Sequence, residues 1–221
     1  MSKSRGNVVN PDDVVKQYGA DTARIYTMFM GPFEQMIPWD GKGIVGCRRF
    51  IEKVYKLTQT SVISTKNEEL ESLLHKTIKK VGEDIDATKF NTAISALMEF
   101  VNKWQVSGGL YKKDAEKFLI LLSPFAPHVT EELWKVLKRK GMCLEQRWPK
   151  YDEDLVKEKN ISFIIQINGK VRDRIEVAGG VSQKEAEKIV MKSAKIKPWL
   201  KGKTVVKIIF VPDKLINIVC E

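Results

Sequence analysis

Two neighbouring stretches decide the fold of this chain: LESLLHKTIKKVGEDI at residues 70–85 and FNTAISALMEFVNKW at residues 90–104. Apolar residues recur in both stretches at steps of three and four, which places them on one face of a helix. The apolar positions are Leu70, Leu74, Ile78, Val81 and Ile85 in the first stretch, and Phe90, Ile94, Leu97, Val101 and Trp104 in the second. The pattern predicts two amphipathic helices, each with one apolar stripe.

The same spacing continues on both sides of this pair. It is carried by Phe50, Val54 and Leu57 before the pair, and by Phe118, Leu122, Val129, Leu133 and Leu137 after it. Ser107-Gly108-Gly109 interrupts one connection, and the prolines in SPFAP at residues 123–127 interrupt another, because proline cannot donate to a continuing helix. We therefore predict a bundle of about five helices.

The periodicity changes to two after Pro149. Ile161, Phe163, Ile165 and Ile167 alternate with other residues, Asn168-Gly169 is a strong hairpin signal, and Val171, Ile175 and Val177 alternate back. Ser182 to Glu185 form a capping box before a helix. Residues 205–211 and 215–219 are predicted to be two more strands. The fold class is thus α+β, a helical bundle followed by a small β-β-α-β-β domain.

The net charge of +10 is concentrated toward the C-terminus. Residues 160–221 contain 12 Lys+Arg and 6 Asp+Glu, a net of +6. A basic surface favours polyanions, of which nucleic acid is the commonest, because bound phosphates release counterions. Charge alone leaves open the alternative of a lysine-rich surface that only aids solubility.

The alternation of the predicted hairpin gives these charges a location. Lys170, Arg172 and Arg174 are expected to share one face of its return strand, opposite the face of Val171, Ile175 and Val177. The following helix adds lysines expected along one side, namely Lys184, Lys188, Lys192 and Lys195. This surface suits the backbone of a folded RNA, and the alternative is the solvated face of an amphipathic element.

The N-terminal heptapeptide MSKSRGN combines a lysine between two serines with an arginine and a glycine. Flexible backbone, small donors and positive charge suit a polyphosphate, although a basic N-terminal stretch is often a solvated tail. Asn10-Pro11-Asp12 and the sequence GADTAR at residues 19–24 are helix-start signals, so two short helices should follow.

Three separated segments carry a resemblance to a known family. Residues 1–32, MSKSRGNVVNPDDVVKQYGADTARIYTMFMGP, resemble the KMSKS loop and following helices of class I aminoacyl-tRNA synthetases for leucine, isoleucine, valine and methionine. Residues 122–134, LSPFAPHVTEELW, resemble a segment of that subgroup's helical anticodon-binding domain. Residues 166–172 and 211–215, QINGKVR and VPDKL, resemble the C-terminal domain of bacterial leucyl-tRNA synthetases.

The resemblance implies three regions: residues 1–40 as a remnant of the catalytic region, 41–150 as an anticodon-binding bundle, and 151–221 as a small tRNA-binding domain. It implies a leucine--tRNA ligase of protein biosynthesis, with ATP as substrate accompanied by Mg²⁺ and tRNA-Leu as partner. By match to the motif, Lys3 is the catalytic lysine and binds the ATP phosphates together with Ser2 and Ser4.

The tRNA-binding residues expected on this basis are Lys170, Arg172, Arg174, Lys188 and Lys192. The chain departs from the family in two respects. The lysine that begins KMSKS is absent before Met1, and no HIGH tetrapeptide occurs. We therefore expect a C-terminal part that is inactive without an N-terminal catalytic and editing portion.

Two other readings remain open: a free-standing RNA-binding module without catalysis, and the isoleucine- or valine-type equivalent. A protein-interaction bundle is the least specific reading. The NGKVR hairpin favours leucine over isoleucine and valine.

The cysteines, the histidines and the length of the apolar runs exclude further classes of function. Three cysteines without a CxxC pair and only two histidines predict neither a metal site nor a disulfide framework. His128 lies near Glu131 and Glu132 and is expected to be packed or paired at the surface rather than catalytic. The sequence has no apolar run of membrane-spanning length and no signal peptide, so we expect a cytoplasmic protein.

Overall fold

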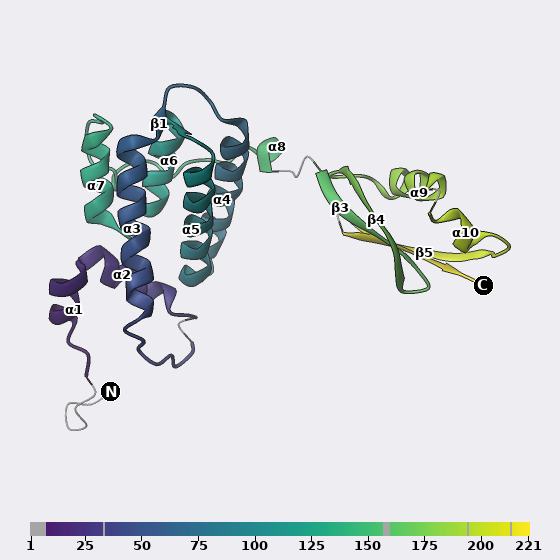
Figure 1. Ribbon diagram of the computed structural model, residues 1–221, viewed down its shortest axis with the longest axis horizontal. Helices are drawn as coiled ribbons and strands as arrows, with labels where there is room; N and C mark the ends of the chain where they lie inside the picture. Colours follow the sequence, from purple (N-terminus) through teal and green to yellow (C-terminus); the bar gives the residue numbers. More distant parts are fainter. Residues whose placement is uncertain (1–7, 33, 157–159, 194, 213) are drawn as a thin grey trace. The chain divides into compact units, whose positions relative to one another are not determined.

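The computed structural model describes residues 8–32, 34–156, 160–193, 195–212 and 214–221. The chain forms two compact units, the first ending at Val156 and the second following it. Figure 1 shows helices in the first unit and a sheet with short helices in the second. The predicted α+β class is confirmed.

The first unit begins with two short helices, α1 (Pro11–Tyr18) and α2 (Ala20–Phe29), as the helix-start signals predicted. Asn10 caps α1, because its side chain accepts a hydrogen bond from the Asp12 N–H. Gly19 separates the two helices with a positive φ of 89°, a conformation that glycine adopts without strain.

Five longer helices form the predicted bundle. They are α3 (Gly43–Thr60), α4 (Glu68–Asp86), α5 (Phe90–Val106), α6 (Lys112–Leu122) and α7 (Pro127–Val136). Helix α4 packs along α5, the pair predicted from the two amphipathic stretches. The breaks at residues 107–109 and 123–127 separate helices as expected, and a short α8 (Glu153–Val156) closes the unit.

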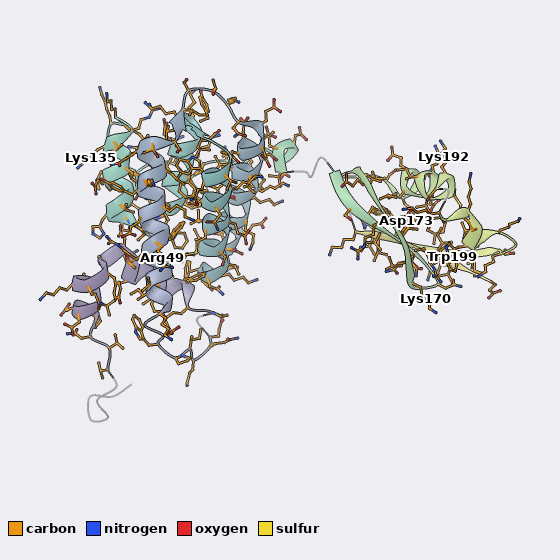
Figure 2. The ribbon with its side chains drawn as sticks, in the orientation of Figure 1. Arg49, Lys135, Lys170, Asp173, Lys192 and Trp199 are labelled. Carbon is orange, nitrogen blue, oxygen red and sulfur yellow. The ribbon has the colours of Figure 1, made fainter. Side chains whose placement is uncertain are left out.

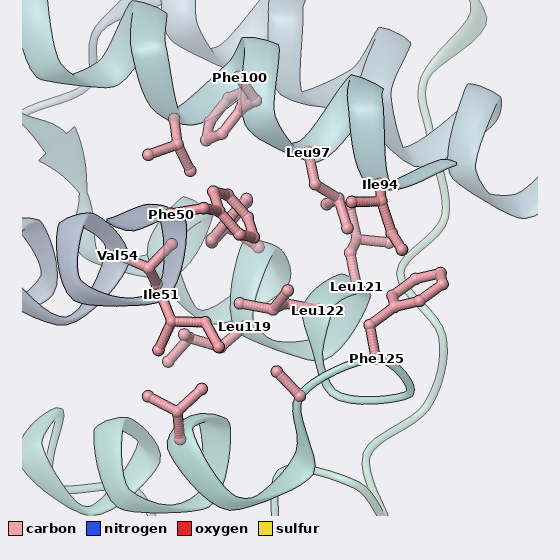
Figure 3. Packing of buried hydrophobic residues seen from close by; sticks show 14 of the residues in the cluster. Phe50, Ile51, Val54, Ile94, Leu97, Phe100, Leu119, Leu121, Leu122 and Phe125 are labelled. Carbon is pink, nitrogen blue, oxygen red and sulfur yellow. The ribbon is translucent and has the colours of Figure 1, made fainter. Parts of the chain in front are cut away.

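The bundle core buries the predicted apolar faces. Figure 3 shows Phe50 and Val54 of α3 near Leu97 and Phe100 of α5. Leu97 and Phe100 are fully buried, and Phe100 stacks on Phe118 with ring centroids 5.2 Å apart. Burying one large apolar side chain contributes about 1.5–3 kcal/mol, so this core dominates the stability of the unit.

A two-residue parallel pair, β1 (Val62–Ile63) and β2 (Leu110–Tyr111), closes one end of the bundle. The Trp104 indole N–H donates to the Ser61 carbonyl at 3.2 Å beside it. This pair was not predicted, because two residues are too few to show a period.

The second unit has a four-stranded sheet in the order β4-β3-β6-β5. Its elements are β3 (Asn160–Ile167), β4 (Lys170–Ala178), α9 (Gln183–Lys192), α10 (Lys197–Leu200), β5 (Val205–Val211) and β6 (Leu215–Cys220). The predicted hairpin, capping box and two later strands are confirmed, and α10 is an addition. The central strands β3 and β6 are parallel.

One face of this sheet carries the core of the second unit. Phe163, Ile165 and Ile167 of β3 are buried together with Ile216 and Ile218 of β6. Ala186 and Val190 of α9 and Ile196 pack on this face, so the helical segment covers it. The opposite face has no such cover among the described residues of the unit and includes Val171, which is exposed.

The predicted alternation along β4 is wrong, because the hairpin contains a β-bulge. Ile165 pairs with Asp173 and Gln166 with Val171, so Arg172 is an extra residue on β4. Each such insertion exchanges the two faces of the strand beyond it. Arg174, opposite Ile164, therefore lies on the open face, whereas Lys170, opposite the buried Ile167, belongs to the helix-covered side. The three cations do not share one face.

Candidate nucleic-acid interface

The segment MSKSRGN at residues 1–7, hereafter the signature loop, contains Ser2, Lys3 and Ser4 and lies outside the described residues. The structure does describe the helices that follow it and shows how they are held. These helices contact α3, α5 and α7, which places them against the bundle.

Asp21 at the start of α2 caps helix α7, which is 107 residues away in sequence. Its buried carboxylate accepts the Val129 N–H at 2.7 Å and the His128 N–H at 3.4 Å, two of the first donors of α7. The residue before α7 is Ala126, which has no side-chain acceptor, and no side chain caps the helix locally. A distant carboxylate thus supplies the cap and also favours the positive end of the helix dipole.

Arg24 adds a second link between the same segments. Its guanidinium donates to the Pro124 carbonyl at 2.8 Å, in the turn between α6 and α7. The first and second family-like motifs therefore contact each other through Asp21 and Arg24. This contact holds the helices after the signature loop against the α6–α7 turn.

His128 is a surface residue paired with Asp21. Its Nδ1 lies 2.7 Å from Asp21 Oδ1, and its side chain is 73% exposed. The expectation of a surface-paired histidine is confirmed, but the partner is on α2 rather than in its own helix. Next to it, Tyr55 donates to Glu132 at 2.8 Å, which raises the pKa of the tyrosine.

An apolar cavity of about 930 Å³ lies in the same unit, between the ends of α2 and α4 and the segment 148–153. Phe90, Phe125 and Trp148 contribute aromatic surface to it. Lys79 lies 5.5 Å from the ring centroid of Tyr151 at its rim. The cavity is large enough for an apolar or planar group.

In the second unit, Arg172 stacks on Trp199 of α10. The guanidinium carbon lies 3.5 Å from the centroid of the indole ring, a close cation–π contact. The neighbouring Asp173 is bound by Lys195 at 3.3 Å and by the Ser193 hydroxyl at 3.4 Å. Desolvation raises the pKa of Asp173, but the hydrogen bonds from Lys195, Arg174 and Ser193 outweigh it and lower the pKa overall.

The other predicted tRNA-binding cations are exposed but dispersed. Lys170 is at the hairpin turn, whereas Lys188 and Lys192 lie on α9. Figure 2 shows Lys170 and Lys192 well separated within the unit. Lys195, expected beside the helical lysines, lies beyond the end of α9 and pairs with Asp173 instead.

The described residues include no group of three or more His, Cys, Asp or Glu side chains that could hold a metal ion. Burial raises the pKa of Cys47 to about 11 and that of Cys143 to about 12, so neither thiol is reactive at neutral pH. In the described part of the chain, none of the helices has the length and hydrophobicity of a membrane crossing.

Two family models match the chain. Residues 67–189 match the anticodon-binding domain of tRNA ligase, and residues 1–40 match the class I tRNA synthetases for I, L, M and V. The first match covers more than half of the chain. The chain belongs to the anticodon-binding domain family of tRNA ligases.

A solved structure extends this likeness over the whole chain. The agnB2 LeuRS of Agrobacterium radiobacter K84, crystallised in a ternary complex with tRNA and LeuAMS, superposes with a TM-score of 0.83 at 28% identity. The similarity covers 100% of the present chain and 31% of the LeuRS chain. The chain thus spans about a third of its relative, and the resemblance stated from the three motifs is confirmed.

Sequence reasoning missed two features of this family member. The first is the Asp21 cap, for which the signal was a helix start at Pro127 preceded by a residue without a capping side chain. The second is the Arg172–Trp199 stack, which no spacing indicated because the bulge interrupts the alternation.

Proposed function

We propose that the chain is the C-terminal part of a leucine--tRNA ligase, which uses ATP to attach leucine to tRNA-Leu. The observation that carries this proposal is the likeness to a LeuRS over both units, at 28% identity and a TM-score of 0.83. The match of residues 1–40 to the class I synthetases supports the assignment of the signature loop.

In the proposed reaction, a carboxylate oxygen of leucine attacks the α-phosphorus of ATP, and the bond to pyrophosphate breaks. Negative charge grows on the departing pyrophosphate, so a nearby ammonium binds the transition state more strongly than the ground state. We assign this role to Lys3, with Ser2 and Ser4 shaping the loop around the phosphates. A hydroxyl at the 3′ end of tRNA-Leu then attacks the leucyl carbonyl and releases AMP.

The helices after this loop are proposed to transmit its position to the bundle. Asp21 and Arg24 anchor α2 to the α6–α7 turn at 2.7 and 2.8 Å. The loop is then held at a defined place relative to a surface that binds tRNA. Positioning of this kind matters because a displacement of about 1 Å can cost about 100-fold in rate.

The tRNA contacts proposed for the second unit use the exposed cations Lys170, Arg174, Lys188 and Lys192. Arg172 is included, and its guanidinium is stacked on Trp199, a neutral ring that leaves the positive charge in place. Salt titration of tRNA binding tests each residue, since every lost phosphate contact lowers the slope of log K against log salt by about 0.9.

The function is tested by reconstitution. The chain alone is expected to give no leucine-dependent exchange between ATP and pyrophosphate, because we place the ATP and leucine pockets in an N-terminal portion. Fused behind that portion of a bacterial leucyl-tRNA synthetase, it should support leucylation of tRNA-Leu but not charging of tRNA-Ile. Exchange by the chain alone, or a folded fusion that never charges tRNA-Leu, would contradict the proposal.

A further inference from the structure

A basic hollow lies on the bundle, between α6 and the segment that follows α7. Its volume is about 750 Å³, and Trp134 forms part of its wall. Its charged lining consists of Lys113, Lys117, Lys138, Arg139, Lys140 and Glu116. Five cations and one carboxylate give the lining a formal charge of +4.

The cations of this hollow fall into two groups. Lys117 is paired with Asp114 at 3.0 Å, and Arg139 is paired with Glu116. Lys113, Lys138 and Lys140 are exposed and have no carboxylate within ion-pair distance among the described residues. Three charges therefore remain available to a ligand.

The segment that presents these charges is held in place. The Lys138 N–H donates to the Lys135 carbonyl at 2.8 Å and the Arg139 N–H to the Trp134 carbonyl at 3.1 Å, the pattern of a Schellman motif. The Trp134 indole N–H donates to the Lys140 carbonyl at 3.4 Å. Glu131 accepts the N–H groups of Cys143 and Leu144 at 3.0 and 2.9 Å.

Lys138 occupies the position of this motif that favours glycine. Its φ is +56°, in the left-handed region that non-glycine residues adopt at a cost. A lysine there does not improve the turn, and its exposed ammonium remains available to an anion.

We propose that this hollow is a phosphate-binding site for the backbone of a folded RNA, with Lys113, Lys138 and Lys140 as its principal contacts. The inference rests on the proposed function, in which the chain binds tRNA, and adds a site on the bundle to those in the second unit. A folded RNA fits because a concave, positively charged wall focuses the field on a polyanion. Its aromatic wall is buried, so the site recognises charge rather than bases.

The test compares two triple variants of the full chain in titrations with tRNA at rising salt. The first is Lys113→Gln, Lys138→Gln and Lys140→Gln. The control is Lys16→Gln, Lys56→Gln and Lys89→Gln, three exposed lysines from α1, α3 and the α4–α5 turn that do not line the hollow. Both variants lose three positive charges, so they differ only in where on the protein those charges are removed.

We expect the hollow variant to reduce the slope of log K against log salt by up to about 3, since each phosphate contact contributes about 0.9. The control should change the slope by less than about 1. Equal slopes for the two variants would overturn the site while leaving tRNA binding intact. Absence of binding by the parent chain would instead overturn the proposed function. Loss of polyglutamate binding with unchanged tRNA binding would show an acidic-protein site and also overturn the proposal.

A single variant separates binding from folding. Lys138→Gly removes the charge but relieves the left-handed backbone, so its unfolding midpoint in urea should be no lower than that of the parent. Its salt slope for tRNA should still fall by about 1. A stable Lys138→Gly variant with an unchanged slope would exclude Lys138 from the site.

Discussion

At the scale of single residues, Asn168 joins the hairpin turn to the neighbouring strand. Its φ of 48° begins the tight turn, and its side chain donates to the Cys220 carbonyl at 2.9 Å and accepts the Cys220 N–H at 2.8 Å. The side chain thereby extends the pairing of β3 with β6 by one residue. One asparagine thus serves both as a turn residue and as part of the sheet.

Asn168→Gly tests this second role. Glycine keeps the positive φ but loses two hydrogen bonds of about 1 kcal/mol each, so the second unit should lose about 2 kcal/mol. Amide hydrogen exchange at Ile216 and Ile218 should accelerate by about 30-fold. Asn217→Ala, which loses only the bond from the Gly169 N–H, should have about half the effect on stability. Unchanged protection in Asn168→Gly would contradict the role.

His75 makes the first unit sensitive to pH. It is buried, and its Nδ1 accepts the Asp152 N–H at 2.8 Å. Burial and the nearby Lys117 lower its pKa, against smaller opposing effects of Asp114, Glu71 and Asp152. The unfolded chain therefore binds more protons on His75 than the folded chain does near and below pH 6.5.

The sign of the effect follows from this lowered pKa. Stability from His75 is fully present above about pH 6.5 and is lost as the pH falls through the folded-state pKa. The urea midpoint of the first unit should be lower at pH 5.5 than at pH 7.5, and His75→Asn should reduce the difference. An identical pH dependence in the variant would show that other groups cause it.

At the scale of elements, α7 depends on a cap from α2. Asp21→Ala removes the acceptor of the Val129 and His128 N–H groups and should destabilise the first unit by about 2 kcal/mol, the upper end for a lost cap. His128→Ala, which removes only an exposed ring, should cost less than about 0.5 kcal/mol. Urea unfolding measures both. Equal losses would mean that the side-chain hydrogen bond between Asp21 and His128, rather than the cap, is the stabilising contact.

The sequence predicted elements well where a period extends over several turns or strands. The faces led by Leu70 and Phe90 and the Asn168-Gly169 hairpin are local patterns, so they are readable from the chain. The bulge at Arg172 is not, because alternation has the same appearance with or without an extra residue. The Asp21 cap could not be predicted either, because it joins residues that are 107 positions apart in the sequence. Of the candidate site, Lys3 is proposed from its motif alone.

The bulge has a measurable energetic consequence. Arg172 and Trp199 are in cation–π contact at 3.5 Å, and such contacts contribute about 0.5–2 kcal/mol. A double-mutant cycle with Arg172→Gln and Trp199→Leu should give a coupling energy of about 1 kcal/mol in urea unfolding. A coupling near zero would mean that the stack does not stabilise the second unit.

At the scale of the whole molecule, the chain combines the helices that follow the proposed catalytic loop, an anticodon-binding bundle and a basic sheet unit. The net charge of +10 is divided between the units, with +6 in residues 160–221. Binding of tRNA should therefore depend on both units. The C-terminal cations and the basic hollow of the bundle are expected to contribute separately to the salt slope.

The most direct measurement of the central claim is ATP–pyrophosphate exchange by the reconstituted ligase that carries this chain, with Lys3 intact or changed to alanine. Removal of one such charge-stabilising donor typically lowers the rate by about 10²–10³. We expect that loss for Lys3→Ala and normal exchange for Lys16→Ala. Normal exchange in Lys3→Ala would contradict the account.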